Sequence, residues 1–578
     1  MSVDHDAIVS ADLAATDQED RVSDVIEPRA EDGRPPRRAP RRMSDRLADT
    51  WLPRAPVVVF AAVEAYALVL WMAAGQREWF YLDDWDFLAG RRLGSIRDLL
   101  RPHNEHWTTL PVLIYRMLFR TYGLRTYFPY RLVGVLTYLG LAALLFVFMR
   151  HAGVNPWIAS IAASRYALFA AGAANIVRPF QLTFTGALAL GLVHLILADH
   201  DGPLDRRDWF GLLAGFASLM MSGIGVPMAL VVGLAVLLRR GWRLALFHTV
   251  PLGVCYSIWW LAIGRTGSVM RVGPQPRVTF NTAFNFVESG VRGAFSALGQ
   301  VAGFGVLLGI VFVVGLVVAW FARGASGRRA ELAAPISLFL GAIVFLAITA
   351  LGRAGFGIDY ARTGRYLSIA SAMVLPAIAV AIDALTLQRR SLVIVAVVVL
   401  AVGIQPSVIT DFGSHNEFLE GDANTKAMML ALPRDPVALK VPRTVRPETI
   451  TARAVTIGWL LDGVAQHRIP APAVNGITMR RSNNFRLSFD QEKGHVPGHN
   501  CQTVDQKMLL TLHKGDVIGL YDHAAYFVPE HREQLAGYRL QFLPHANKPI
   551  FVVRNVGGVR ILPVTPPYAP RVCVTRGA

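Results

Sequence analysis

Residues 57–75 carry the sequence VVVFAAVEAYALVLWMAAG, in which Glu64 is the only charged side chain. An apolar run of about 20 residues is long enough to cross the hydrocarbon core of a bilayer as a helix. Comparable runs recur along the chain as far as Gln405. The sequence therefore predicts a polytopic α-helical membrane protein with about ten or eleven transmembrane helices. The predicted spans are 57–75, 130–149, 156–173, 180–198, 209–221, 226–238, 244–263, 301–321, 332–351, 366–387 and 391–410.

The composition of the whole chain agrees with a membrane protein. Of its 578 residues, 53% are hydrophobic and 17% are charged, and the mean hydropathy is +0.38. A soluble domain has about a quarter of its residues charged. The formal net charge is +17. The arginines, however, lie at span ends and in loops rather than in a stripe with stacking aromatic residues, so no nucleic-acid partner is expected.

The chain divides into three parts by composition. Residues 1–54 are polar and contain the run PRRAPRRMSDR, so we expect a disordered basic cytoplasmic tail. Residues 55–410 form the predicted transmembrane domain, with a long first outer loop at 76–129. Residues 411–578 are numerous enough for a core of their own. We predict an extracytoplasmic soluble domain there, α+β or β-rich, with a helical pattern at 449–465 and strand-like runs at 507–512, 538–543, 550–553 and 559–564.

The arginines near the span ends set the predicted orientation. Six of them lie between residues 37 and 54, so the N-terminus should be cytoplasmic. Later clusters such as Arg206-Arg207 and Arg239-Arg240 fall on the same side only if residues 209–238 form a helical hairpin instead of one long helix. The hairpin places the first outer loop, the loop 352–365 and the C-terminal region together on the extracytoplasmic face of the plasma membrane.

The three cysteines leave their pairing open. Cys255 lies in an apolar run, whereas Cys501 and Cys573 both lie in the C-terminal region. Because the sequence has no CxxC motif and no Cys/His cluster, a structural zinc site is not expected. Cys501 and Cys573 could form a disulfide in an oxidising compartment or remain free thiols.

The first outer loop contains the acidic pair Asp83-Asp84, a few residues after the first span. A carboxylate at a membrane surface is disfavoured unless it has a partner or a function. In a site of low dielectric constant, one aspartate could act as a general base while the other stays ionised and orients an acceptor. The structural alternative is an N-cap or a solvated turn before a helix at residues 85–92, because aspartate is a good N-cap.

The same loop contains His103, Asn104, Glu105 and His106. Two histidines three residues apart could share a helical face and bind a metal ion, but no further ligand accompanies them. Hydrogen bonding to a sugar or to the aspartates is the interpretation we favour, and a solvated turn is the structural alternative. Residues 110–122 then predict an amphipathic helix at the membrane interface.

Two further groups of polar residues complete the candidate site. The sequence DYARTGRYL places Arg362, Arg365 and Tyr366 at the start of the tenth predicted span. Arginine presents a planar fork of donors that suits phosphate oxygens, although Arg and Tyr also anchor helices at a membrane interface. The sequence NIVRPFQ places Arg178 and Gln181, with Asn175, on the same predicted face as the aspartates.

These features together resemble the GT-C superfamily of membrane glycosyltransferases, and are similar to the protein mannosyltransferase and aminoarabinose transferase families. The resemblance rests on the acidic pair after the first span, the long outer loop, the many spans and the R-x-x-R-Y pattern, and it covers about residues 57–410. It assigns no subfamily. The HNEH stretch and the C-terminal domain are not general features of the superfamily.

The resemblance implies an inverting transfer of a sugar from a polyprenyl-phosphate donor to an extracytoplasmic glycan, lipid or protein acceptor. Asp83 or Asp84 matches the catalytic aspartate, which acts as the general base on the acceptor hydroxyl. Arg362 and Arg365 match only loosely the arginines that bind the donor phosphate. No cofactor is firmly implied, and assistance by a divalent metal stays open.

Two other classes of protein compete with a transferase. A transporter or flippase for a lipid-linked or anionic substrate should carry ionisable residues deep within its spans, and repeated halves. His194 is the deepest polar residue, Glu64 and Asp383 lie in or near span ends, and the sequence shows no convincing repeat. A membrane scaffold with an extracytoplasmic binding domain is the third class.

Overall fold

The computed structural model describes residues 54–402, with gaps at 93, 267–277, 301–302, 326 and 388. Residues 1–53, which make up nearly all of the predicted basic tail, lie outside the described part. Beyond residue 402 the described residues are 425–434, 443, 446–447, 452, 454–470, 489–493, 501–505, 508–513, 515–521, 525–529, 540–542, 549–553, 557–563 and 569–577.

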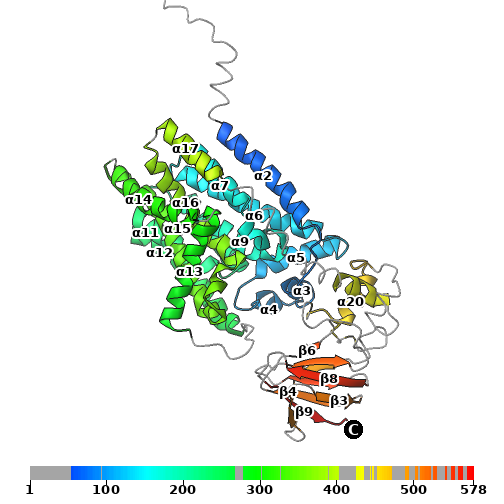
Figure 1. The fold of residues 1–578 in the computed structure, drawn as a ribbon. Helices are drawn as coiled ribbons and strands as arrows, with labels where there is room; N and C mark the ends of the chain where they lie inside the picture. The colour runs from blue at the N-terminus through cyan, green and yellow to red at the C-terminus, as the bar shows by residue number, and fades with distance from the viewer. Residues whose placement is uncertain are drawn as a thin grey trace, which may run out of the picture. The chain divides into compact units, whose positions relative to one another are not determined.

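Seven helical segments of the described residues are long and apolar enough to cross a membrane, which supports the predicted membrane class (Figure 1). They are Ala55–Ala74 (α2), Phe128–His151 (α6), Pro179–Ala198 (the turn η2, Pro179–Gln181, with α9, Leu182–Ala198), Trp242–Ala262 (α12), Phe304–Ala325 (α14), Arg329–Phe356 (which includes α15, Ala333–Arg353) and Gly364–Leu385 (α16).

The other four predicted spans are shorter helices of 12 or 16 residues. Helices of this length are about 18–24 Å long, whereas the hydrocarbon core is about 30 Å thick. Seven of the eleven predicted spans therefore correspond to helices long and apolar enough to cross a membrane, and the other four correspond to shorter helices. The shorter helices are Pro156–Ala167 (α7), Arg206–Met221 (α10), Gly225–Arg240 (α11) and Arg390–Ala401 (α17).

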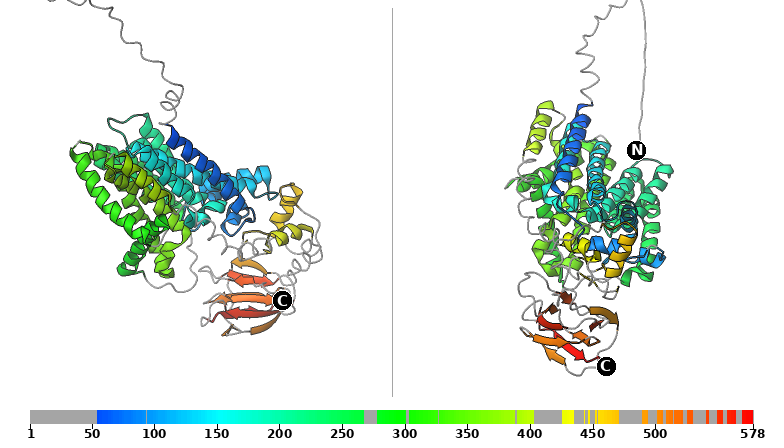
Figure 2. Two further views of the ribbon diagram at one scale, coloured as in Figure 1. Left: turned by 45° about the horizontal axis from the view of Figure 1, so that its top comes forward. Right: turned by 90° about the vertical axis from the view of Figure 1, so that its right-hand side faces the viewer.

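Helix α16 is the most buried of the seven long apolar segments. Figure 2 gives two further views of the helical region in which it lies. Most residues of α16 are buried, and many are small: its sequence is GRYLSIASAMVLPAIAVAIDAL. Small side chains let neighbouring helices approach closely. At Gly315 of α14, a Cβ atom would lie only 2.3 Å from the carbonyl oxygen of Ala381 in α16. The sequence of α16 thus fits an inner helix packed closely against α14.

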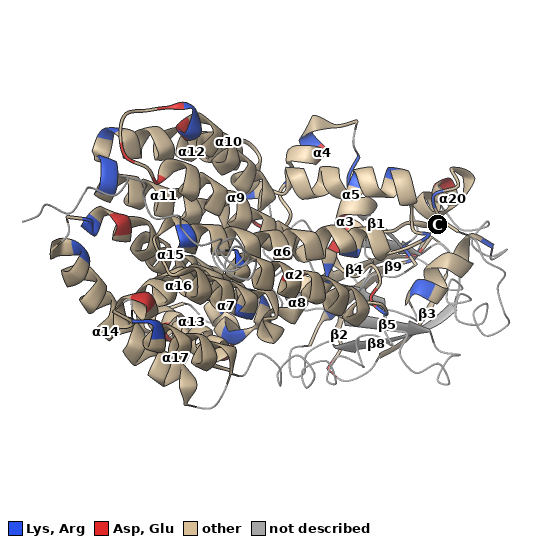
Figure 3. Cartoon of the chain, turned by 90° about the horizontal axis from the view of Figure 1, so that it is seen from above, with Lys and Arg blue, Asp and Glu red and all other residues tan. Residues whose placement is uncertain are grey.

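Charged residues are sparse along the helices and gather near helix ends and in loops, as the colouring of the cartoon in Figure 3 shows. Val69 of α2, Val306 of α14 and Leu351 of α15 are each about 70% exposed. Such exposure is costly in water but natural against lipid tails. The pattern agrees with the mean hydropathy of the chain.

One helix, Phe280–Gly299 (α13), was absent from the predicted spans. Its polar residues interrupt any continuous apolar run, and Glu288 pairs with Arg292 on its exposed side. Its other side buries Phe286, Ala294 and Leu298. A count of apolar residues does not detect a helix of this kind, because its signal is the 3.6-residue period.

Residues 209–238 form the predicted hairpin. Helix α10 ends at Met221, and α11 begins four residues later at Gly225, where a Cβ atom would lie 2.6 Å from the backbone nitrogen of Leu219. Arg240, at the end of α11, bonds Asp208 at the start of α10, with NH1 2.5 Å from Oδ1. The two helices are therefore antiparallel.

The first outer loop contains three helices, Asp83–Leu88 (α3), Ile96–Leu100 (α4) and Thr109–Tyr122 (α5). Helix α5 confirms the predicted amphipathic helix at 110–122. It buries Val112, Tyr115 and Phe119 and exposes Leu113 and Met117. The helix predicted at 85–92 begins two residues earlier and ends four residues earlier than expected.

The C-terminal region is β-rich, as predicted, and its short helix Ile457–Ala465 (α20) falls within the predicted helical pattern. Its nine described strands form two antiparallel sheets, with the strand orders β1-β7-β4-β9-β2 and β3-β8-β5-β6. Cys501 and Cys573 face each other across β2 and β9 and form a disulfide, which settles their pairing. The strands are Phe489–Lys493 (β1), Cys501–Thr503 (β2), Met508–Leu512 (β3), Val517–Tyr521 (β4), Ala525–Pro529 (β5), Leu540–Phe542 (β6), Pro549–Val553 (β7), Gly557–Pro563 (β8) and Arg571–Thr575 (β9).

Candidate active site

The acidic pair lies at the start of α3, directly after a strained residue. Leu82 has a φ of 41°, a backbone conformation that side chains other than glycine rarely adopt. Neither aspartate is the N-cap of α3, because Leu82 occupies that position and Asp83 and Asp84 lie in the first turn. The interpretation of an aspartate as the N-cap is therefore wrong. The two carboxylates also have different surroundings.

Asp84 is buried and accepts three hydrogen bonds. The Tyr115 hydroxyl donates to its Oδ1 at 2.5 Å, and the Tyr127 hydroxyl and the Tyr81 backbone N–H donate to its Oδ2 at 3.3 and 2.9 Å. Burial raises the pKa of Asp84 to about 6, although the bonds from Tyr115 and Tyr81 oppose the shift. Its carboxylate joins α3 to α5 and to the start of α6.

Asp83 faces outward, and its side chain is 46% exposed. Its Oδ1 lies 3.1 Å from Nε2 of His103. The other ring nitrogen of His103, Nδ1, lies 2.9 Å from Oδ2 of Asp86. One buried histidine therefore bridges two carboxylates and leaves Asp83 accessible to a ligand.

The charges around His103 hold it in its protonated form. Burial disfavours the imidazolium, but contacts with Asp83 and Asp86 outweigh it and raise the pKa of His103 to about 9. Asp86 also pairs with Arg91 and Arg101, each at 3.0 Å. Despite burial, these partners and His103 hold the pKa of Asp86 well below its usual range.

The HNEH residues form a tight turn rather than a helix. The backbone N–H and C=O groups of His103 and His106 bond each other in both directions, and Asn104 has a φ of 51°. The alternative in which both histidines share one helical face is therefore wrong, whereas His103 does contact the aspartates, as the favoured interpretation predicted. The ring of His103 packs against Phe87 and Phe180, whereas that of His106 packs against Phe184.

Glu105 connects the first outer loop to the loop before α16. Its Oε1 lies 2.7 Å from NH2 of Arg353, at the end of α15. Arg353 also interacts with Tyr366 of α16. The structure therefore brings the HNEH turn together with the RTGRY segment, as the predicted topology required.

The three predicted site residues of the RTGRY segment, Arg362, Arg365 and Tyr366, have different surroundings. Arg365 is half-buried, bonds the hydroxyl of Tyr360 and lies over the ring of Tyr366, 5.1 Å from its centre. Its backbone oxygen accepts a bond from Nδ2 of Asn175, in the short helix Ala173–Val177 (α8), at 2.9 Å. Arg362 is exposed, and its Nε lies 3.1 Å from Oγ of Ser289 in α13.

Arg178 and Gln181 lie beside the acidic segment. The guanidinium of Arg178 is 4.9 Å from the centre of the Tyr81 ring, and its Nε is 3.7 Å from Oε2 of Glu78. Gln181 is half-buried and follows Phe180, whose ring contacts His103. Both predicted residues thus belong to the surroundings of α3 and the HNEH turn.

Several buried polar atoms of these segments have no hydrogen-bond partner among the described residues. Buried polar atoms usually have a partner in the protein, in water or in a ligand. The atoms of these segments that lack a protein partner in the described part of the chain are therefore open to hydrogen bonds from water or a ligand. They are Oε2 of Glu105, Oδ1 of Asn175, Oε1 of Gln181, Oγ of Ser222 and Oγ1 of Thr363.

Sequence reasoning missed residues that define this site, above all Tyr115, Tyr127 and Arg353. Tyr115 lies on the buried side of α5, four residues after Pro111 and four before Phe119. That helical period was visible in the sequence, but nothing in it identified Asp84 as the partner of Tyr115. Arg353 had no local signal, since it is 248 residues away from Glu105.

No family model, no curated protein and no solved structure matches this chain. The class that the described residues define is a polytopic helical protein with seven potential membrane spans and a small C-terminal sheet region.

Proposed function

We propose that this chain is a GT-C-like membrane glycosyltransferase that moves a sugar, with inversion, from a polyprenyl-phosphate donor to an extracytoplasmic acceptor. In the reaction, the aspartate removes the proton of the acceptor hydroxyl as its oxygen attacks the anomeric carbon. The bond from that carbon to the phosphate oxygen breaks, and the polyprenyl phosphate leaves with its negative charge. A general base of this kind contributes about 10²–10⁴-fold to a rate.

One observation carries the choice of Asp83 as the base. It is the accessible member of the acidic pair, and its Oδ1 lies 3.1 Å from Nε2 of the buried His103. Asp84 is less suited, because it is buried and its carboxylate already accepts bonds from Tyr115, Tyr127 and Tyr81. The proposal therefore assigns proton transfer to Asp83 and the shape of the site to Asp84.

The phosphate of the donor would bind Arg362 and Arg365. Their segment is tied to the HNEH turn through the Glu105–Arg353 pair, at 2.7 Å. A guanidinium that meets a leaving phosphate stabilises the charge that develops in the transition state. Oδ1 of Asn175 and Oε1 of Gln181, which have no hydrogen-bond partner in the part of the chain that the structure describes, offer acceptors to sugar hydroxyls.

The proposed location is the plasma membrane, with the N-terminus in the cytoplasm and the site and C-terminal domain outside. The disulfide between Cys501 and Cys573 supports an extracytoplasmic C-terminal region, because disulfides persist in oxidising compartments. The lipid bilayer, the polyprenyl-phosphate sugar and a glycan, lipid or protein acceptor are the proposed partners.

The test measures sugar transfer from radiolabelled polyprenyl-phosphate sugars by membranes that contain the full chain. We expect Asp83→Asn to lower the rate about 100-fold or more without changing the amount of folded protein. Asp201→Asn is the matched control, since Asp201 is an exposed aspartate in a different loop. Normal transfer by Asp83→Asn, with loss in a folded Asp84→Asn variant, would assign the base to Asp84 instead.

A transporter or flippase for a lipid-linked or anionic substrate is the second candidate, because of one buried chain of ionisable groups. Nε2 of His194 lies 3.0 Å from Nδ1 of His248, whose Nε2 lies 3.0 Å from Oδ1 of Asp208. Ionisable residues within spans are common in transporters. The test measures the flux of lipid-linked sugar into proteoliposomes. Loss of this flux in His194→Gln, with normal flux in Asp83→Asn, would favour this class.

A further inference from the structure

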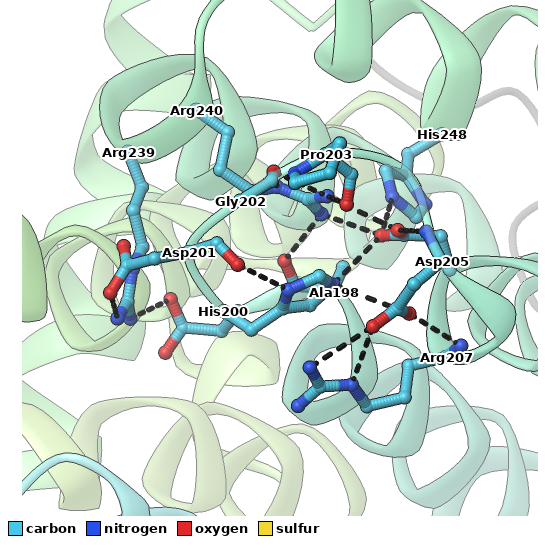
Figure 4. Close-up of polar contacts among 12 residues, drawn as sticks. Ala198, His200, Asp201, Gly202, Pro203, Asp205, Arg207, Arg239, Arg240 and His248 are labelled. Atoms are coloured by element: carbon cyan, nitrogen blue, oxygen red, sulfur yellow. Dashed lines mark hydrogen bonds and ion pairs between the residues drawn. The ribbon is translucent and has the colours of Figure 1, made fainter.

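A second cluster of charged residues lies where α9, α10, α11 and α12 approach one another (Figure 4). It is built from the loop after α9, which carries His200 and Asp205, and from Asp208 at the start of α10. Arg239 and Arg240 join it from the end of α11. Helix α9 separates this cluster from Gln181 of the candidate active site, and a helix of 17 residues is about 25 Å long.

Charged side chains of both signs meet in this cluster. Four carboxylates, of Asp199, Asp201, Asp205 and Asp208, meet three guanidinium groups. Arg239 pairs with the first two carboxylates, and Arg207 with the third. Arg240 pairs with Asp208, which is fully buried.

His200 supplies the observation that points to a ligand. Its Nδ1 donates a hydrogen bond to the backbone oxygen of Asp201 at 2.9 Å, because a carbonyl oxygen only accepts. In the neutral ring, Nε2 then carries the lone pair. The side chain is 8% exposed, and Nε2 has no hydrogen-bond partner among the described residues.

The lone pair of Nε2 is directed toward two carboxylates. Nε2 lies 3.3 Å from Oδ1 of Asp208 and 3.7 Å from Oδ1 of Asp205. The three ligand atoms all lie within 4.8 Å of one another. In a tetrahedral zinc site with bonds of about 2.0–2.2 Å, neighbouring ligand atoms are about 3.3–3.6 Å apart. The observed separations from Nε2 are close to that spacing.

We propose that His200, Asp205 and Asp208 bind one divalent transition-metal ion, for which Zn²⁺ is the probe. The imidazole nitrogen and two carboxylate oxygens suit such an ion. The backbone oxygen of Asp201 orients the imidazole ligand, as outer partners of metal-binding histidines commonly do. Arg240 and His248 do the same for Asp208. The ion would join the loop after α9 to the base of the α10–α11 hairpin.

The test uses the full chain, purified in detergent, stripped with a chelator and then loaded with Zn²⁺. Mass spectrometry of the dialysed protein should give about one zinc ion per chain, and X-ray absorption should show one imidazole among oxygen ligands. We expect His200→Ala and Asp205→Asn to lose this ion. Asp201→Asn is the matched control, because Asp201 lies in the same loop and keeps its backbone oxygen.

The His106→Gln variant is a second control, because it tests whether the zinc binds at the HNEH turn instead. This variant should keep the bound zinc. The size-exclusion profile reports whether each variant folds, and His200→Gln replaces His200→Ala if the latter aggregates. Wild type that retains no zinc above the level of His200→Gln or Asp205→Asn overturns the proposal. Zinc lost only in His106→Gln overturns it as well, and assigns the metal to the other face.

Discussion

At the scale of single residues, two neighbouring aspartates have different surroundings. Asp84 accepts bonds from Tyr115 and Tyr127 inside the protein, whereas Asp83 lies beside His103 and its side chain is 46% exposed. The sequence located the acidic pair and the HNEH stretch in one loop. It could not assign their partners, because Tyr115 is 31 residues after Asp84 and its hydroxyl has no local signature.

The pH dependence of stability should report the charge of His103. Its pKa is raised to about 9 by Asp83 and Asp86, above the value of about 6.5 in an unfolded chain. The stabilisation is therefore fully present below about pH 6.5 and is lost as the pH rises through about 9. We expect a loss on the order of 3 kcal/mol, measured as a falling midpoint of thermal unfolding.

The His103→Gln variant provides the control for that measurement. Its midpoint should be lower than that of the wild type at about pH 7 and should fall less as the pH rises. Asp84, with a pKa of about 6, is already ionised above pH 7 and adds no slope there. Equal slopes in His103→Gln and the wild type would contradict the ion pair.

At the scale of helices, long apolar segments were predictable and mixed ones were not. All eleven predicted spans contain helices, since hydrophobic runs identify buried or lipid-facing segments directly. Nine of these helices begin and end within four residues of the expected bounds. Helix α7 ends six residues before the predicted bound at 173, and α17 ends at Ala401, with residues 403–410 of its predicted span outside the described part. Helix α13 was missed because Glu288, Arg292 and its asparagines interrupt the apolar run, and the predicted spans rest on apolar runs rather than on an amphipathic 3.6-residue period. The hairpin α10–α11 was predicted from charge alone, and the Arg240–Asp208 pair accounts for it.

That pair should be important for stability. Arg240 and Asp208 are both buried, and Arg240→Ala would leave the Asp208 carboxylate without its guanidinium partner. Removing one member of a buried ion pair costs about 3–5 kcal/mol. We expect a correspondingly lower midpoint of thermal unfolding in the presence of a chelator. Arg243→Ala is the control, because Arg243 is exposed and lies over Trp242; an equal loss in both variants would refute the special role of Arg240.

At the scale of the whole molecule, composition predicted the membrane class and the β-rich C-terminal region, but not how distant segments meet. Helix α12 illustrates the point. The Nε1 of Trp259, near its end, bonds the backbone oxygen of Leu100 in the first outer loop at 2.8 Å. Near its start, His248 bonds Asp208. The ends of α12 thus lie at opposite ends of the helical region, about 31 Å apart for 21 residues.

This arrangement predicts opposite accessibility for Arg97 and Arg243, which are both exposed. We would introduce Arg97→Cys or Arg243→Cys into a Cys255→Ser background and treat intact cells with a maleimide that does not cross membranes. Arg97→Cys should be labelled directly, and Arg243→Cys only after the cells are made permeable. Labelling of both from the same side would contradict a membrane crossing by α12.

The α10–α11 hairpin touches the candidate active site at its tip and the charged cluster at its base. A Cβ atom on Gly223, in the turn, would lie 2.7 Å from Nδ1 of His106, while Arg240 and Asp208 fasten the other end. The length of the hairpin therefore fixes the position of its turn, at Gly223, relative to the ring of His106. One residue added to α11 would shift the turn along the helix axis by about 1.5 Å and rotate it by about 100°. The number of residues in α11 is thus as much a part of the site as the side chains that line it.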